Sequence, residues 1–260
     1  MAVLLQLRSQ MQQQGLDALV VPRADEFLGE YIPESNERMR FVSQFTGSAG
    51  LVIVTPNSAA VFVDGRYTVQ VKRQVDTVDF EIGDLGDAQT MAWVKANTPT
   101  KATIGVDAHT VCQTQFERWQ TLLGERTLVD TKGNVIDAVW TDRPAVVAQQ
   151  GFNLEARYTG ESSLSKRARL GQTLSTLGLD GFWVFLPESV SWLLNVRGSD
   201  IPQLPILQSH ALLKADGSVQ WFIEPSRLPL DWQRHVGDGV TAHDPGELEG
   251  ILKTWAGCAV

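Results

Sequence analysis

The sequence is poor in cysteine, with two residues, Cys112 and Cys258, in a chain of 260. Two cysteines cannot frame a small disulfide-stabilised domain, so we expect a reducing compartment and predict a cytoplasmic location. Basic residues are outnumbered by acidic ones, 22 to 30, and the formal net charge is −8. This balance argues against a nucleic-acid partner, which would require a basic face. No apolar run approaches the ~20 residues of a membrane span, so no membrane partner is expected.

What remains is the composition of a globular protein, with 43% apolar and 20% charged residues. Helical patterns alternate with short apolar runs rich in β-branched residues, which predicts an α/β layer architecture. Two such runs, 51–54 and 59–63, flank the turn-forming residues 55–58 and predict a β-hairpin. A hairpin among strands joined by helices makes the expected sheet mixed.

The elements expected in the first half alternate along the chain. They are helices over 4–15, 68–75, 87–97, 114–123 and 134–140, and strands over 16–22, 51–54, 59–63, 76–82, 103–107 and 127–130. The strand over 76–82 is expected because polar and apolar residues alternate there.

The same plan begins again beyond Tyr158, which indicates an internal duplication. A helix over 165–177, a strand over 182–185 and a hairpin of 211–214 with 219–223 repeat the earlier order. The second copy reaches a helix over 246–255 and ends where the next strand is expected. We therefore predict two related domains, 1–145 and an incomplete 159–260, joined by a connector over 146–158. Either the chain is a fragment or another chain completes the sheet.

No catalytic or metal-ligating residue is predicted in this chain. The four histidines lack the spacing of a helical zinc pair. Ser48 lies in a glycine-containing loop, 47–50, that does not match a nucleophile elbow or a phosphate-binding loop. We interpret His109 as a surface residue hydrogen-bonded beside Asp107, and His243 as part of a solvated loop.

Asp64 and Arg66 lie two residues apart where the first hairpin ends. In extended backbone they would point to the same side and could form a structural ion pair. Alternatively, Arg66 binds a carboxylate or carbonyl oxygen of a ligand. The residues leave both interpretations open. Trp192 is interpreted as a core residue because Leu193 and Leu194 follow it.

Six motifs stand in a fixed order along the chain. They are Glu30-Tyr31-Ile32-Pro33, Phe45-Thr46-Gly47-Ser48-Ala49-Gly50, Asp64-Gly65-Arg66-Tyr67, Trp140-Thr141-Asp142-Arg143-Pro144, Tyr158-Thr159-Gly160 and Trp192-Leu193-Leu194-Asn195-Val196-Arg197-Gly198-Ser199-Asp200. Together they resemble the large Xaa-Pro aminopeptidases, also called aminopeptidase P, over essentially the whole chain. The resemblance implies two tandem creatinase-type N-terminal domains, each a mixed sheet flanked by helices, with the second truncated.

In that family a third, pita-bread domain carries the catalytic site with two divalent metal ions, usually manganese. Nothing in this sequence matches its metal ligands, so the resemblance implies a chain that is inactive by itself. The implied role is to form a homodimer and to narrow access to a site that removes the N-terminal residue from peptides with proline second. Arg66 matches an arginine that contacts the bound peptide, and Glu30 lies in the same region. These two are the predicted substrate-binding residues.

Two alternatives stay open. The chain could be a stand-alone interaction module that kept the fold without the chemistry. It could also be the N-terminal part of a creatinase-like pita-bread hydrolase with another small substrate. Metal ligands encoded beyond Val260 would exclude the module, and activity on Xaa-Pro peptides rather than creatine would exclude the creatinase-like enzyme.

Overall fold

The computed structural model describes residues 2–146 and 149–260. The chain divides into two compact units, Met1–Val146 and Val147–Val260. The expected connector over 146–158 includes residues 147–148, which lie outside the described residues. Its later part forms the short strand β7 (Phe152–Asn153) and the start of helix α6 (Ala156–Thr159). No helix among the described residues is long and apolar enough to cross a membrane.

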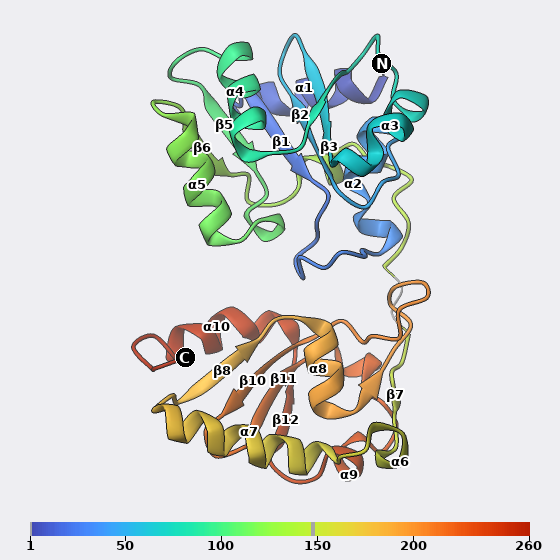
Figure 1. Ribbon diagram of the computed structural model, residues 1–260, viewed down its shortest axis with the longest axis vertical. Helices are drawn as coiled ribbons and strands as arrows, with labels where there is room; N and C mark the ends of the chain where they lie inside the picture. The colour runs from blue at the N-terminus through green and yellow to red at the C-terminus, as the bar shows by residue number, and fades with distance from the viewer. Residues whose placement is uncertain (1, 147–148) are drawn as a thin grey trace. The chain divides into compact units, whose positions relative to one another are not determined.

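The described residues of the first unit form six strands between helices (Figure 1). Its strands are β1 (Ala18–Pro22), β2 (Gly50–Val54), β3 (Ala59–Val63), β4 (Glu81–Asp84), β5 (Thr103–Val106) and β6 (Thr127–Asp130). Its α-helices are α1 (Ala2–Gln13), α2 (Arg38–Ser43), α3 (Thr68–Gln74), α4 (Asp87–Asn97) and α5 (Gln113–Leu123). Its 3₁₀ helices are η1 (Glu34–Asn36), η2 (Gly65–Tyr67), η3 (Ala108–Thr110) and η4 (Val135–Ala138).

The strands of the first unit form one mixed sheet in the order β4-β3-β2-β1-β5-β6. Strand β2 is antiparallel to both β1 and β3, whereas β4, β5 and β6 are parallel to their neighbours. Val54 pairs with Ala59 across the turn, so the predicted hairpin is confirmed. The mixed α/β sheet flanked by helices is confirmed as well.

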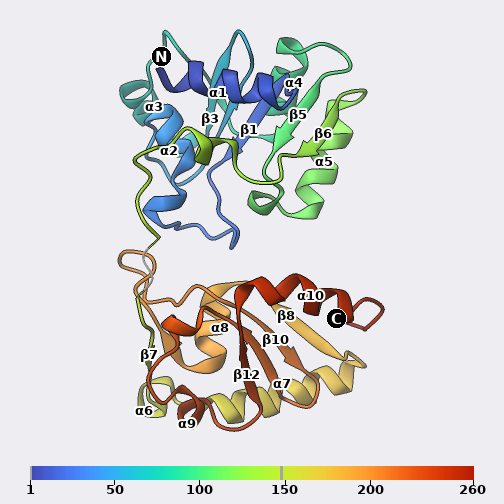
Figure 2. The ribbon, with the colours of Figure 1, turned by 180° about the vertical axis from the view of Figure 1, so that it is seen from behind.

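Helices cover both faces of this sheet, as Figures 1 and 2 show. Leu7 of α1 and Met39 of α2 pack on one face, and Met91 of α4 and Leu123 of α5 on the other. All five residues of β3 are buried in consequence. A strand covered on both sides has no wet face, which explains why its sequence is a continuous apolar run.

The predicted strand over 76–82 is wrong in its first half. The Asp76 carboxylate accepts a hydrogen bond from the Val78 backbone N–H at 2.9 Å and closes a turn there. Val78 is 85% exposed, and β4 begins only at Glu81. Alternation of polar and apolar residues favours a strand, but the local aspartate hydrogen bond competes with strand pairing.

The second unit contains six further strands, with helices α6 to α10. Its strands are β7, β8 (Gly181–Val184), β9 (Val196–Arg197), β10 (His210–Lys214), β11 (Val219–Phe222) and β12 (Val240–His243). Its helices after α6 are α7 (Ser163–Leu177), α8 (Pro187–Leu194), α9 (Trp232–Val236) and α10 (Leu248–Thr254), with 3₁₀ helices η5 (Pro225–Arg227) and η6 (Pro245–Glu247).

The main sheet of the second unit repeats half of the first. Its order is β12-β11-β10-β8, with β10 antiparallel to both neighbours and β12 parallel to β11. These are the order and directions of β4-β3-β2-β1, so the predicted duplication is present in the fold. Strand β12 was not predicted. Strands β7 and β9 form a separate two-stranded sheet.

Two adjacent basic residues of α7 are buried, and their side chains donate to backbone carbonyls and to an amide oxygen. Lys166 donates to the Trp192 carbonyl at 2.8 Å and to Asn195 Oδ1 at 2.7 Å, at the end of α8. Arg167 donates to the carbonyls of Gly217, Val236 and Asp238 at 2.8–2.9 Å. Carbonyls at helix ends and turns have no partner within their own helix, so these cations satisfy them and hold α7 in place.

Two interpretations of single residues in this unit are wrong. Trp192 is not in the core: it is 43% exposed, and its ring lies 4.3 Å from Lys166 Nζ. His243 does not lie in a solvated loop: it ends β12, and its ring stacks on Phe222 with centroids 5.4 Å apart. Trp192 packs against the Lys166 cation, and His243 packs against the aromatic ring of Phe222. Both partners are distant from these residues in the sequence.

His210 gives the second unit a defined sensitivity to acid. It begins β10, its ring packs against Phe185 with centroids 5.4 Å apart, and burial lowers its pKa to about 4. The unfolded chain binds this proton near the usual pKa of about 6.5. The folded state is therefore destabilised progressively as the pH falls from about 6.5 to about 4.

We expect His210→Gln to remove much of this loss, which amounts to about 3 kcal/mol over that range. The measurement is urea unfolding at several pH values, followed by tryptophan fluorescence. His109→Gln is the matched control, because that side chain is 76% exposed. Equal acid sensitivity in the wild type and in His210→Gln would contradict the assignment.

Candidate functional site

Strand direction brings three loops of the first unit to one edge of its sheet. Because β2 is antiparallel to β1 and β3, the carboxyl ends of β1 and β3 lie at the same edge as the beginning of β2. Pro22 pairs with Leu51, and Gly50 pairs with Val63. The loop after β1, the loop before β2 and η2 after β3 therefore meet there. Open α/β sheets commonly bind ligands at the carboxyl ends of their strands.

Asp64 and Arg66 form the ion pair considered above. Asp64 Oδ1 accepts from the Arg66 backbone N–H at 2.9 Å and from Arg66 Nε at 2.8 Å. The backbone hydrogen bond, then the guanidinium, lowers the pKa of Asp64 below its usual value. The Arg66 side chain nevertheless remains 64% exposed. Asp64 thus holds the guanidinium through one nitrogen and leaves it accessible to a ligand.

Arg23 is the buried link among these loops, and sequence reasoning gave it no role. It directly follows β1, and its side chain is 8% exposed. Its Nη1 donates to the carbonyls of Glu30 at 2.8 Å and Ser48 at 3.1 Å, and its Nη2 pairs with Glu37 Oε1 at 2.7 Å. The only sequence signal was a basic residue immediately after a buried strand.

Tyr67 joins the motif of Arg66 to the loop before β2. Its hydroxyl lies 2.8 Å from Ser48 Oγ, and the Arg66 guanidinium carbon lies 5.3 Å from its ring centre. The hydrogen bond with Ser48 lowers the pKa of Tyr67, with smaller contributions from Arg66 and Arg23. Arg66 and Tyr67 are thereby fixed relative to the loop that Arg23 holds.

Glu30, the second predicted site residue, is exposed, and its backbone is held by Arg23. Its carboxylate also acts on Arg66. The pKa of Arg66 is raised chiefly by the hydrogen bond with Asp64, and the charge of Glu30 makes a smaller contribution in the same direction. The structure therefore places both predicted residues near the same edge of the sheet, close enough for the charge of Glu30 to act on Arg66.

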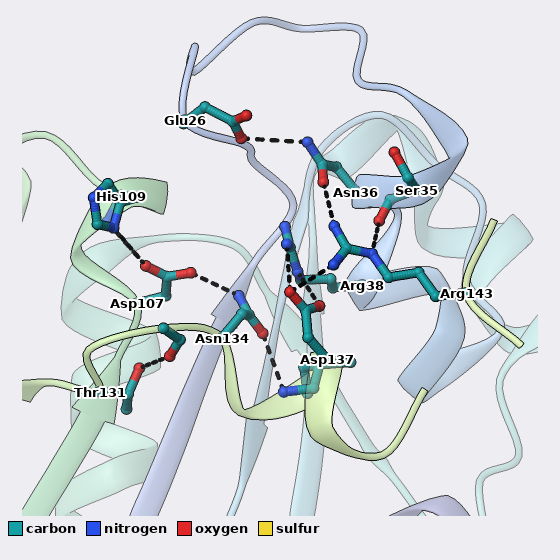
Figure 3. Close-up of polar contacts among 12 residues, drawn as sticks. Glu26, Ser35, Asn36, Arg38, Asp107, His109, Thr131, Asn134, Asp137 and Arg143 are labelled. Atoms are coloured by element: carbon teal, nitrogen blue, oxygen red, sulfur yellow. Dashed lines mark hydrogen bonds and ion pairs between the residues drawn. The ribbon is translucent and has the colours of Figure 1, made fainter. Parts of the chain in front are cut away.

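A second polar cluster lies near the carboxyl end of β1 and is drawn in Figure 3. Asp137 accepts from Arg38 Nε and Nη2 at 2.7 and 2.8 Å, and from Arg143 Nη1 at 2.7 Å. Arg143 also donates to the Ser35 carbonyl at 2.6 Å and to Asn36 Oδ1 at 3.0 Å. These bonds join segments about a hundred residues apart, so the cluster is a structural cross-link.

The pKa of Arg38 reflects two opposing effects. Burial acts to lower it, but the hydrogen bond and charge of Asp137 more than offset this, so the net shift is upward. Arg38 therefore stays charged inside the cluster. Its guanidinium is engaged by Asp137 rather than presented to a ligand.

Among residues 2–146 and 149–260, no group of three or more His, Cys, Asp or Glu side chains could hold a metal ion. His109 is exposed, with Nδ1 3.3 Å from Asp107 Oδ1. Asp107 is engaged on its other oxygen by Asn134 Nδ2 at 3.0 Å.

The second unit uses the corresponding place differently. Its 3₁₀ helix η5 follows β11 as η2 follows β3, and its arginine, Arg227, pairs with Asp200. The side chains of Arg227 and Asp200 are only 11% and 2% exposed. This arginine is committed to a buried ion pair, so the exposed cationic site belongs to the first unit.

Comparison with known proteins adds the family. A family model described as the creatinase/prolidase N-terminal domain matches residues 4–139, and a second with the same description matches residues 142–258. Xaa-Pro aminopeptidase 2 of Rattus norvegicus is 31% identical over 241 residues, which are 90% of this chain and 36% of the relative. A probable Xaa-Pro aminopeptidase P of Laccaria bicolor is 34% identical over 238 residues, covering 89% of this chain and 37% of the relative.

The chain therefore spans less than two fifths of the length of these relatives. Among solved structures, an X-prolyl aminopeptidase from Caenorhabditis elegans matches with a TM-score of 0.88 and 26% identity. The match covers 98% of this chain and 44% of that protein, which is described as a cytosolic enzyme with a di-nuclear active site. The chain belongs to the creatinase/prolidase N-terminal domain family, as it occurs in Xaa-Pro aminopeptidases, and contains two such domains in tandem.

Proposed function

We propose that this chain is the non-catalytic N-terminal half of a proline-specific metallo-aminopeptidase, which releases the N-terminal residue from Xaa-Pro peptides. Its role is to restrict and orient substrate and to contribute to a homodimer in the cytoplasm. The observation that carries the proposal is the exposed Arg66 guanidinium, held by Asp64, in a chain about a third identical to Xaa-Pro aminopeptidases. The names of these relatives favour this function over a creatinase-like enzyme.

The proposed interaction is with peptide backbone. An extended peptide presents carbonyl oxygens and N–H groups, and its carboxyl end is anionic. Arg66 supplies charge-assisted donors for an oxygen, and Glu30 supplies an acceptor for an N–H group or an ammonium group. Such contacts do not depend on which side chains the peptide carries. They therefore suit a site that selects peptides by length and extended conformation.

The proposed metal ions do not fit this chain, because its described residues include no suitable ligand cluster. In the proposed enzyme, two divalent ions such as manganese would be bound outside it and would activate the attacking water. None of the steps assigned to Arg66 or Glu30 passes through them. We expect the chain alone to have no peptidase activity.

In the complete enzyme, Arg66→Ala should raise KM for tripeptides and longer substrates roughly tenfold or more, with little change in kcat and metal content. A hydrogen bond from a charged group contributes about 1.5–3 kcal/mol, and loss of uniform binding appears in KM. The measurement is steady-state kinetics on peptides of increasing length.

Arg73→Ala is the matched control, because Arg73 is an exposed arginine on neighbouring α3. Unchanged kinetics of Arg66→Ala on every peptide length would remove Arg66 from the substrate site. Arg66→Lys should recover part of the loss, since it restores the charge without the planar fork.

The geometry that holds Arg66 can be tested on this chain alone. Ser48→Ala removes the hydrogen bond that lowers the pKa of Tyr67, so we expect that pKa to rise toward its ordinary value. The measurement is a spectrophotometric titration of the phenols, and Tyr67→Phe identifies which of the three tyrosines is responsible. A Tyr67 titration unchanged by Ser48→Ala would contradict the arrangement.

A further inference from the structure

A cavity of about 330 Å³ lies at the edge of the first unit's sheet that also carries Arg66. Its lining includes Pro22 at the end of β1, Leu51 near the beginning of β2, Leu85 just after β4, and residues 110–112 beyond β5. It therefore lies where β1 stands between antiparallel β2 and parallel β5. Open α/β sheets commonly bind ligands outside the carboxyl ends of their strands. The volume is also typical of ligand pockets, which measure about 300–1,000 Å³.

Two walls of the cavity continue into the segments around Arg66. The Leu85 N–H donates to the carbonyl of Val63 at 2.9 Å, and Val63 is the last residue of β3 before the motif of Arg66. Leu28 lines the cavity from the loop after β1, which also contains Glu30. The same loops therefore present the cavity and the exposed guanidinium.

Polar side chains in the wall are already hydrogen-bonded within the protein. Asp87 accepts from Gln115 Nε2 at 2.6 Å and from Trp119 Nε1 at 2.8 Å. Thr110 Oγ1 donates to the Asp107 carbonyl at 2.7 Å. The surface left for an occupant is mostly apolar. Such a cavity favours an apolar group, because removal of apolar surface from water is favourable without a matching hydrogen bond.

Leu28 reaches the cavity from a strained backbone position. Its φ is 53°, in the left-handed region, where glycine and asparagine are favoured over leucine. The Asp25 carbonyl accepts from the Leu28 N–H at 3.1 Å, and the Asp25 carboxylate accepts from the Phe27 N–H at 3.0 Å, so a local turn holds this conformation. The side chains of Leu28 and Leu85 are still 47% and 40% exposed. Strained positions cluster at binding sites, so this turn and its exposed leucine favour a ligand here.

We propose that this cavity is an apolar subsite, which receives the side chain of an aliphatic or aromatic residue of the peptide whose backbone Arg66 binds. The inference rests on the proposed function, because the occupant is the proposed substrate. Arg66 offers a positive charge to a carbonyl or carboxylate oxygen, and the subsite offers apolar surface to a side chain of the same peptide. One extended peptide is complementary to both.

The residue that binds in the subsite lies beyond the proline. In the proposed enzyme, the bond that breaks joins the first residue to the proline and must reach metal ions outside this chain. This chain therefore contacts the third and later residues of the peptide. The subsite gives the enzyme a preference for apolar residues after the proline, which Arg66 cannot supply because it binds backbone.

The complete enzyme tests this preference with Ala-Pro-Leu-Leu and Ala-Pro-Gly-Gly as substrates. We expect kcat/KM to be roughly tenfold higher for the leucine peptide, because a few methylene groups in an apolar pocket give a factor of this size. Leu28→Asn should remove most of this ratio. Asparagine suits the positive φ at this position, so the variant should be as stable as the wild type in urea unfolding. A ratio that Leu28→Asn leaves unchanged would overturn the proposal.

Val78→Asn is the matched control, because it also replaces an exposed apolar residue and lies outside the cavity. It should leave both kcat/KM values unchanged. If the enzyme cleaves neither peptide, the proposed function fails and the subsite with it. If it cleaves both and Leu28→Asn lowers both kcat/KM values equally, only the subsite fails. Loss of a dimer in Leu28→Asn, measured by sedimentation, would assign the cavity to a second copy and would also overturn the proposal.

Cys112 gives a readout on this chain alone, without peptidase activity. Its thiol is exposed and lines the cavity, so a bound leucine side chain should slow its alkylation by iodoacetamide. The protein used is the Cys258→Ser variant, which has a single thiol. Ala-Pro-Leu-Leu should reduce the alkylation rate roughly fivefold at about four times its Kd, and Ala-Pro-Gly-Gly should protect far less. Equal alkylation rates with the two peptides would overturn the subsite.

Discussion

The antiparallel course of β2 between β1 and β3 is the constraint on which the rest of the first unit depends. Two reversals of direction place the ends of β1 and β3 at one edge, so Arg23 and Asp64 meet there although some forty residues separate them. Burial of both faces fixes the register, because a shift by one residue would move every side chain to the wrong layer.

Buried basic side chains then hold the irregular segments. Arg23 joins two loops to Glu37, and Arg38 and Arg143 share Asp137. In the second unit, Lys166 and Arg167 bind carbonyls at helix ends and turns. A buried charge is costly unless its hydrogen bonds are made, so each of these residues ties its partners to one geometry. Arg66 is held in a different way, because its exposed guanidinium is bound by the neighbouring Asp64.

The two copies of the duplicated fold use the arginine at corresponding positions differently. After β3, Arg66 pairs with a neighbouring aspartate and keeps an exposed guanidinium, whereas after β11, Arg227 is buried against Asp200. The repeat is also seen just before the first strand of each main sheet, where the Asp17 N–H donates to the Thr103 carbonyl and the Asp180 N–H donates to the Ala259 carbonyl. Comparison of the two copies thus identifies the positions where they diverged, because corresponding residues there differ in burial or in charge.

The sequence by itself determined the α/β class, the first hairpin, the duplication and the family, because apolar periodicity and turn residues act locally and the motifs stand in order. It also pointed to Arg66 and Glu30, which the fold brings together. Only the tertiary structure showed the roles of Arg23 and Ser48 and placed Trp192 outside the core. Those properties depend on partners such as Ser48 for Arg23, Tyr67 for Ser48 and Lys166 for Trp192, which lie 25, 19 and 26 residues away. Short-range patterns contain no information about which distant segments meet.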